Sequence, residues 1–277
     1  MINMPQKKHV IYVLQEGEIR QDRCLAISSG FVQRVTMIYT MKEMLEMETG
    51  KIENKGFSNF QSAADINMKA LEDIIKNYRL MLKHLIIQAV SAERYEGILH
   101  LIPHERMEDI AIIYKAVIES GGEYTASVIV SHELLKSQGI TESTFKKGAL
   151  KQVSINRPVI IKGLKETIME MTGTAYGEIE DHDEKIFIAT TKDRTYGSGV
   201  IIYPGFLDDA GKQLKGSFYV LPSSIHEVLL LKDDGTMEPD ALRDIVKSVN
   251  RTTVAPEDRL TDSVYRYDCN SGEFKIA

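Results

Sequence analysis

The chain has 277 residues, of which 43% are hydrophobic and 27% charged, and its formal net charge is -6 at pH 7. These proportions are typical of a globular protein with one large domain or two smaller ones, and the acidic balance argues against a nucleic-acid or anionic-membrane partner. No apolar stretch approaches the roughly 18 residues that a membrane-spanning helix needs. The N-terminal residues lack the pattern of a signal peptide. We therefore expect a cytoplasmic protein without a membrane partner.

Cysteine usage points to the same compartment. The chain has two cysteines, Cys24 and Cys269, far apart in the sequence. Two cysteines are too few for a disulfide framework or for a four-thiolate zinc site. Reduced thiols in a reducing compartment are the simplest interpretation.

Residues 1–175 are expected to form an N-terminal region that consists of a strand hairpin followed by a mainly helical segment. The short apolar runs at 10–14 and 24–27 predict the two strands of the hairpin. Apolar residues at spacings of three and four predict the helices. The further elements expected here are helices at 37–47, 66–82, 104–119, 132–138 and 141–151 and a strand at 126–130.

Residues 176–277 are expected to form a C-terminal domain with a mixed sheet and packed helices. The expected strands lie at 185–190, 199–203, 217–221, 226–231, 263–267 and 273–276, and the helices at 206–214 and 239–249. Strands and helices alternate without a steady βαβ rhythm, which predicts an α+β or mixed α/β fold. The gly- and acid-rich stretch 172–184 is the best boundary between the two regions.

The densest polar cluster lies between two apolar strands of the C-terminal region. It contains Ser223, Ser224, His226 and Glu227, and a turn is predicted at Pro222-Ser223-Ser224. In an extended segment Ser224 and His226 share one face. They then suit a nucleophile and its base, or two groups that bind a ligand. The alternative is a structural turn with a buried histidine.

Three more residues are candidate neighbours of this cluster. The helix that leads to Asn250 and the turn that contains Asp262 and Ser263 are able to reach the same end of the sheet. A plain turn at Asp262 and Ser263 is the alternative interpretation.

No metal or cofactor site is expected. His-Glu dipeptides begin at His104, His132 and His226, but none continues to a second histidine in the zinc-protease spacing. The acidic run at 178–184 is typical of a solvated linker. The glycines at 197–199 precede a predicted strand, whereas a dinucleotide-binding loop follows a strand and opens a helix.

Residues 132–151 are similar to a helix-turn-helix, with Gly139 in the turn and Thr141 as the cap of the second helix. The net charge of this segment is only +2. A DNA-binding regulator is therefore a secondary hypothesis, and an ordinary pair of short helices is the alternative.

Several short segments together resemble a bacterial family of domains of unknown function that is common in clostridial gut bacteria and their mobile elements. These segments are IPHER at 102–106, SHELLKSQGITE at 131–142, YPG at 203–205, YVLPSSIHEV at 219–228 and DSVY at 262–265. The resemblance covers residues 35–277 and implies an origin and a fold but no mechanism. The leading hypothesis is a non-catalytic binding or regulatory protein with a protein or small-ligand partner, and the main alternative is a hydrolase that uses Ser224 and His226.

Overall fold

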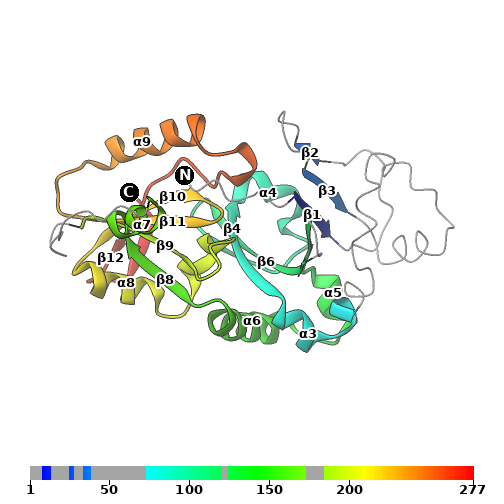
Figure 1. Ribbon diagram of the computed structural model, residues 1–277. Helices are drawn as coiled ribbons and strands as arrows, with labels where there is room; N and C mark the ends of the chain where they lie inside the picture. The colour runs from blue at the N-terminus through cyan, green and yellow to red at the C-terminus, as the bar shows by residue number, and fades with distance from the viewer. Residues whose placement is uncertain (1–7, 14–24, 28–33, 39–72, 120–123, 173–183) are drawn as a thin grey trace.

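Two β-sheets share one hydrophobic core in the computed structural model of the protein (Figure 1). The structure describes residues 8–13, 25–27, 34–38, 73–119, 124–172 and 184–277. Helices pack against both sheets. The fold is thus a mixed α+β fold with a C-terminal sheet, which confirms the predicted fold class.

The first sheet has seven strands in the order β2-β3-β1-β7-β6-β4, with β5 paired to β6 beside this path. Its strands are β1 (Lys8–Val13), β2 (Leu25–Ile27), β3 (Arg34–Ile38), β4 (Leu85–Ser91), β5 (His104–Met107), β6 (Ile110–Glu119) and β7 (Tyr124–Ile129). Strand β1 runs parallel to both β3 and β7. The predicted hairpin of residues 10–14 and 24–27 is wrong, because β3 lies between β1 and β2.

The second sheet is antiparallel throughout its six strands, in the order β13-β12-β10-β11-β9-β8. Its strands are β8 (Val159–Gly163), β9 (Ile186–Thr191), β10 (Phe218–Ser224), β11 (Glu227–Lys232), β12 (Tyr265–Asp268) and β13 (Glu273–Ile276). The boundary placed at residue 176 lies outside the described residues and stays a prediction. Strand β8, which precedes it, pairs with β9 beyond it.

The helices complete the layers around the two sheets. They are α3 (Tyr78–Lys83), α4 (Ala92–Leu99), α5 (His132–Ser137), α6 (Glu142–Asn156), α7 (Leu164–Thr172), α8 (Phe206–Leu214) and α9 (Pro239–Thr252), with the 3-10 helices η3 (Gly197–Ile202) and η4 (Pro256–Asp258). Helix α9 lies over one face of the second sheet and α8 over the other (Figure 1). None of the described helices is long and apolar enough to cross a membrane.

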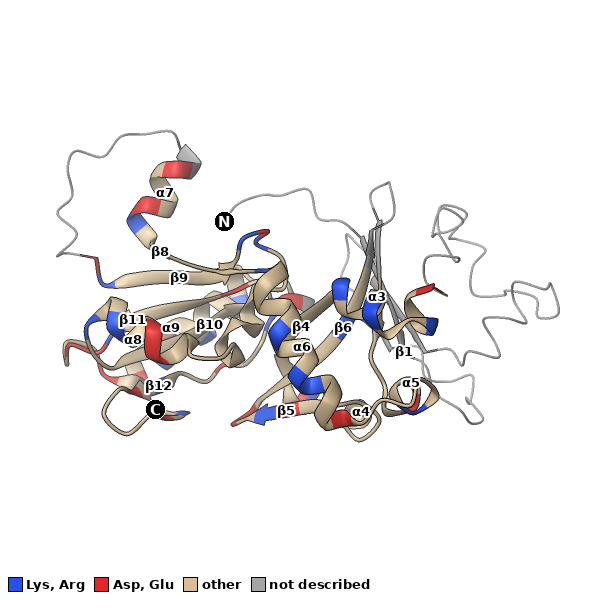
Figure 2. Ribbon diagram, turned by 90° about the horizontal axis from the view of Figure 1, so that it is seen from below, with Lys and Arg blue, Asp and Glu red and all other residues tan. Residues whose placement is uncertain are grey.

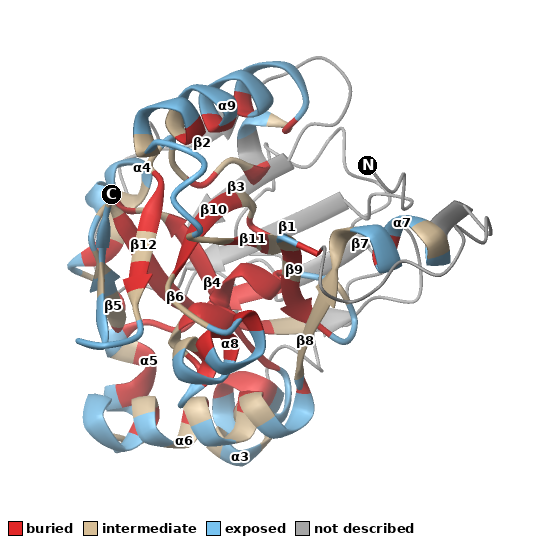
Figure 3. Ribbon diagram, turned by 90° about the vertical axis from the view of Figure 1, so that its left-hand side faces the viewer, coloured by how far each residue is buried: buried red, intermediate tan, exposed pale blue. Residues whose placement is uncertain are grey.

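Helix α9 shows how sequence sets an element and its buried face. Pro239 occupies the first turn, where a missing N–H costs nothing. Leu242, Val246 and Asn250 recur every four residues and are the buried positions of the helix. Figure 3 shows α9 with buried positions on one side and an exposed outer side. The predicted helix at 239–249 is confirmed.

The main core cluster lies between the two sheets. Ile112 and Tyr114 of β6 are fully buried in it together with Phe218 and Leu230 of the second sheet. Phe145 of α6 meets Tyr114 edge to face, with 5.0 Å between the ring centroids. Smaller clusters lie beneath α4 and α9. The two halves of the described chain are therefore joined by buried apolar surface.

The helix predicted at 104–119 is wrong, because this segment forms the hairpin β5–β6. Met107 pairs with Ile110 across a two-residue turn in which Glu108 has a φ of 57°. Residues 110–116 are buried on both faces of the sheet. Because nearly every residue of this run is apolar, the residues at the helical spacings of three and four are apolar as well. The spacing of apolar residues therefore does not distinguish a helix from a strand here.

Two other expected elements need correction. The strand predicted at 199–203 is the 3-10 helix η3. The helix predicted at 66–82 is described from residue 73 and is interrupted at Asn77, whose side chain caps α3 by accepting from the N–H of Leu80. The helix predicted at 37–47 begins inside β3, and its remaining residues lie outside the described part of the chain.

Candidate functional site

The polar cluster lies at the turn between β10 and β11, as expected, but the turn is shifted. Strand β10 continues through Ser224, and Ile225 and His226 form the turn. The predicted turn at Pro222–Ser224 is therefore wrong. Register shifts between Leu221 and Ser224, so Pro222 sits in a bulge, where a strand tolerates a residue without an N–H.

Backbone carbonyls of the turn are bound by the 3-10 helix η3 and by β9. The N–H of Gly197 donates to the carbonyl of His226 at 2.9 Å, and Ser198 Oγ donates to the carbonyl of Ile225 at 2.7 Å. Thr190 Oγ1 also donates to the His226 carbonyl, at 2.7 Å. These bonds satisfy the buried acceptors of the turn and hold it against η3.

The His226 ring is held from two sides. The N–H of Tyr196 donates to Nδ1 of His226 at 3.1 Å, and Nε2 lies 3.9 Å from Oδ1 of Asp258. An Nδ1 that accepts a hydrogen bond places the ring proton of the neutral form on Nε2, which faces the carboxylate. The ring of Tyr196 lies 5.5 Å from the His226 ring, and 30% of the His226 side chain is exposed.

Ser224 supports the turn itself. Its Oγ accepts a hydrogen bond of 3.0 Å from the main-chain N–H of His226, which is a local side-chain turn. The imidazole is directed at Tyr196 and Asp258 rather than at this hydroxyl. The contacts of Ser224 and His226 thus match the structural interpretation better than a nucleophile and its base.

Glu227 and Ser223 form the other half of the cluster. Ser223 Oγ lies 3.5 Å from Oε1 of Glu227, a long hydrogen bond. Burial raises the pKa of Glu227, whereas the hydrogen bond from Ser223 and the charge of Arg194 act in the opposite direction. Both residues are partly exposed.

The three candidate neighbours are arranged around the loop after η4. Asn250 Nδ2 donates to the carbonyl of Thr261 at 2.9 Å and to Oδ1 of Asp262 at 2.8 Å, so these two candidates do meet. Ser263 Oγ instead donates to Oδ2 of Asp109, in the β5–β6 turn, at 2.8 Å. The loop reaches the cluster through main-chain atoms, since the N–H of Ile225 donates to the carbonyl of Asp258 at 2.8 Å.

Sequence reasoning missed the partners that come from other loops. Tyr196 has a φ of 50°, a conformation that no composition signal marks. Asp258 follows an unremarkable Pro-Glu pair. Lys115, inside an apolar run, is 1% exposed and has its Nζ 5.6 Å from the centre of the Tyr196 ring. Lys115, a lysine in the middle of an apolar strand, was the one sequence signal for these partners.

The helix-turn-helix segment does form two helices, α5 and α6, with Gly139 at a φ of 68° between them. Phe145 and its neighbours on α6 face the core. Lys146 binds Glu105 at 2.9 Å and Glu142 at 2.7 Å. Figure 2 shows basic segments along α6 and an acidic one at its beginning, which is Glu142. The central lysine of the segment is therefore neutralised by carboxylates.

Metal ligands do not gather in the described residues, where no group of three or more His, Cys, Asp or Glu side chains suits an ion. The acidic run at 178–184 lies largely outside the described residues.

Comparison with known proteins gives a family. The model of the family of unknown function DUF5688 matches residues 32–269. The chain belongs to DUF5688. No curated protein and no solved structure matches it significantly. Residues 223–227 and 250–263 all lie within the matched part of this DUF5688 chain.

Proposed function

We propose that the protein is a non-catalytic binding or regulatory protein, in which Glu227 and Ser223 receive a cationic side chain of a protein partner. The state of the Glu227 carboxylate carries this proposal. Within the described part of the chain, the hydrogen bond that reaches it is the 3.5 Å bond from Ser223. A partly desolvated carboxylate with such weak support gains from a lysine ammonium or an arginine guanidinium.

Electrostatics support a cationic partner. The net charge of -6 attracts cations to the protein as a whole. Arg194, whose charge acts on Glu227, is shared with Glu170, whose Oε2 lies 3.3 Å from Nη2 of Arg194. Glu227 therefore keeps capacity for another cation.

The other two hypotheses have less support. A hydrolase needs the imidazole at Ser224, and the ring of His226 instead accepts from Tyr196 and faces Asp258. A DNA-binding segment needs basic residues that are not paired, and Lys146 is paired with two glutamates. We therefore do not propose nucleic acid as a partner.

We also propose a bacterial origin, in particular the mobile elements of gut bacteria, and a cytoplasmic location. The origin rests on the resemblance carried by residues 219–228. The location rests on the two widely separated cysteines.

The experiment is a calorimetric titration of the full chain at pH 7.5 with an N-acetylated tetralysine amide as the probe. Glu227→Gln should weaken binding at least about tenfold, because it removes the charge but keeps the shape. Glu166→Gln is the matched control, since it removes the same charge from an exposed glutamate 3.4 Å from Lys162. Equal affinities for the wild type and Glu227→Gln, or no binding by the wild type, would overturn the proposal.

A further inference from the structure

A small cavity lies at the opposite end of β11 from Glu227, beneath the loop that leads into α9. Its volume is about 230 Å³. This is below the roughly 300 Å³ at which sites for drug-sized ligands begin. The cavity therefore suits a ligand of metabolite size, and its location makes it independent of the Glu227 surface.

The floor of the cavity is one row of apolar side chains across three strands. Ile186 of β9 pairs with Leu231 of β11, and Leu231 pairs with Tyr219 of β10. Since paired residues point to the same face of a sheet, the three side chains lie next to one another. Met237 of the loop also lines the cavity. These four side chains offer a surface to a short apolar group.

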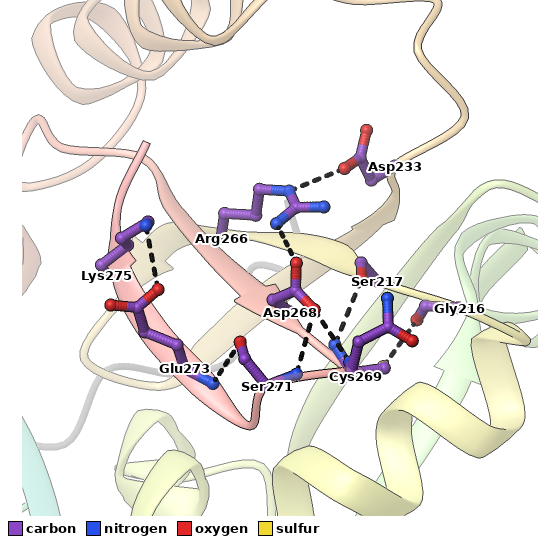
Figure 4. A network of polar contacts seen from close by, with 10 residues as sticks. Gly216, Ser217, Asp233, Arg266, Asp268, Cys269, Ser271, Glu273 and Lys275 are labelled. Carbon is purple, nitrogen blue, oxygen red and sulfur yellow. Dashed lines mark hydrogen bonds and ion pairs between the residues drawn. The ribbon is translucent and has the colours of Figure 1, made fainter.

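The roof is the loop between β11 and α9, and its first residue is anchored. Arg266 Nε binds Oδ2 of Asp233 at 2.7 Å, and Arg266 Nη1 binds Asp268 at 2.8 Å, as Figure 4 shows. The N–H of Asp233 also donates to the carbonyl of Ser217 at 3.1 Å. The loop is thus fixed where it leaves the sheet.

Three charged residues line the cavity, namely Lys185, Lys232 and Asp234. Lys232 Nζ lies 5.7 Å from the centre of the Phe187 ring. Phe187 follows Ile186 in β9 and points to the other face of the sheet, so Lys185 and Asp234 are the charges at the rim. Lys185 Nζ lies 2.6 Å from Oδ2 of Asp234. The N–H of Thr236 donates to Oδ1 of Asp234 at 3.0 Å, and the Thr236 hydroxyl donates to the same oxygen. Asp234 is therefore held in place by its own loop. The Lys185 side chain is 55% exposed, so it is free to move toward a ligand.

We infer that this cavity binds a small aliphatic α-amino acid, with the aliphatic side chain on the Ile186–Leu231–Tyr219 floor. The ligand carboxylate meets Lys185 and the ligand ammonium meets Asp234. A zwitterion joins the existing ion pair without leaving either charge unpaired. A ligand with one charge pairs with only one of these two side chains, so it gains one charge-assisted contact where a zwitterion gains two.

Three probes with the same apolar body test the charge requirement. They are L-leucine, 4-methylpentanoate, which lacks the ammonium, and 3-methylbutylamine, which lacks the carboxylate. In calorimetric titrations of the full chain, L-leucine should bind at least about tenfold more tightly than either of the others. Equal affinities of the three probes, or no binding of L-leucine, would overturn the inference.

Two variants test the location. Lys185→Met should remove the advantage of L-leucine over 3-methylbutylamine. Lys275→Met is the matched control, because Lys275 is also 55% exposed and binds Glu273 at 2.9 Å. Ile186→Phe fills the cavity and should abolish binding of all three probes. The inference is overturned if Lys185→Met keeps the advantage of L-leucine over 3-methylbutylamine, or if a folded Ile186→Phe still binds L-leucine. If Ile186→Phe does not fold, the comparison of Lys185→Met with Lys275→Met decides alone.

Discussion

The main-chain N–H of Tyr196 donates a 3.1 Å hydrogen bond to Nδ1 of His226, across 30 residues of chain. His226→Ala leaves this N–H without its partner, so the free energy of unfolding should fall by about 1–3 kcal/mol. Urea unfolding measures the change. His100→Ala, at an exposed helix end, is the control and should stay within about 0.5 kcal/mol of wild type. If the two variants unfold at the same urea concentration, His226 is not structural, and the hydrolase hypothesis regains support.

Alanine substitutions at two glycines should have opposite effects on stability, because Gly199 of η3 lies close to the first sheet and Gly97 of α4 has open space beside it. A Cβ on Gly199 would lie 2.2 Å from the carbonyl oxygen of Ile87, so Gly199→Ala should destabilise the protein by about 3 kcal/mol or more. A Cβ on Gly97, in α4, meets nothing within 4 Å. Gly97→Ala should therefore stabilise the protein by about 0.5–1 kcal/mol. Thermal unfolding measures both, and a stable Gly199→Ala would contradict the described position of η3.

Lys146 ties α6 to β5, since it binds Glu105 and Glu142 and donates to the carbonyl of His104 at 2.8 Å. Lys146→Met should lower the free energy of unfolding by about 1 kcal/mol at pH 7. The loss should be smaller at high salt, because both glutamates are over 40% exposed and salt screens their attraction to Lys146. The exposed Lys147→Met is the control.

The cost of Lys146→Met should also depend on pH. The hydrogen bond from Lys146 lowers the pKa of Glu142 below its ordinary value of 4.5, against the opposing effect of burial. The folded-state pKa is depressed, so this contribution is present above about pH 4.5 and is lost as the pH falls through the folded-state value. The difference between wild type and Lys146→Met should shrink below pH 4.5 in urea unfolding. A difference that grows on acidification would show that the sign is wrong.

Asp109 joins the first sheet to the C-terminal loop, because its carboxylate accepts hydrogen bonds from the hydroxyls of Ser263 and Tyr265. Burial, and then the hydrogen bond with Asp109, raise the pKa of Tyr265, so its hydroxyl stays protonated as a donor. A double-mutant cycle of Asp109→Ala and Tyr265→Phe should give a coupling energy of about 0.5–3 kcal/mol. Asp109→Ala and Tyr267→Phe should be additive, since Tyr267 binds Asp208. Additivity in both cycles would contradict the described junction.

Elements with strong local signals were predictable from the sequence. Pro239 and the four-residue spacing of Leu242 and Val246 define α9. The strands β12 and β13 and their turn follow from the Asn270–Gly272 signal. By contrast, η3 depends on the approach of Gly199 to Ile87, which lies more than a hundred residues earlier in the chain. No local pattern contains that information.

The candidate site was predictable only in its local part. The hairpin end with Ser223, Ser224, His226 and Glu227 follows from two apolar strands and a polar turn. Its exact turn residues were missed because the bulge at Pro222 is a property of the pairing with β11. Tyr196 and Asp258 were missed because each reaches His226 through folding of a separate loop.

The pH dependence of tetralysine binding tests the central claim most directly, because Glu227 attracts a cation only when it is ionised. Burial raises the pKa of Glu227 above its ordinary value of 4.5. The wild-type affinity should be full at neutral pH and should fall while the pH is still above 4.5, whereas the affinity of Glu227→Gln should stay flat over that range. Parallel curves for the two proteins, or a wild-type affinity that falls only below pH 4.5, would contradict the account.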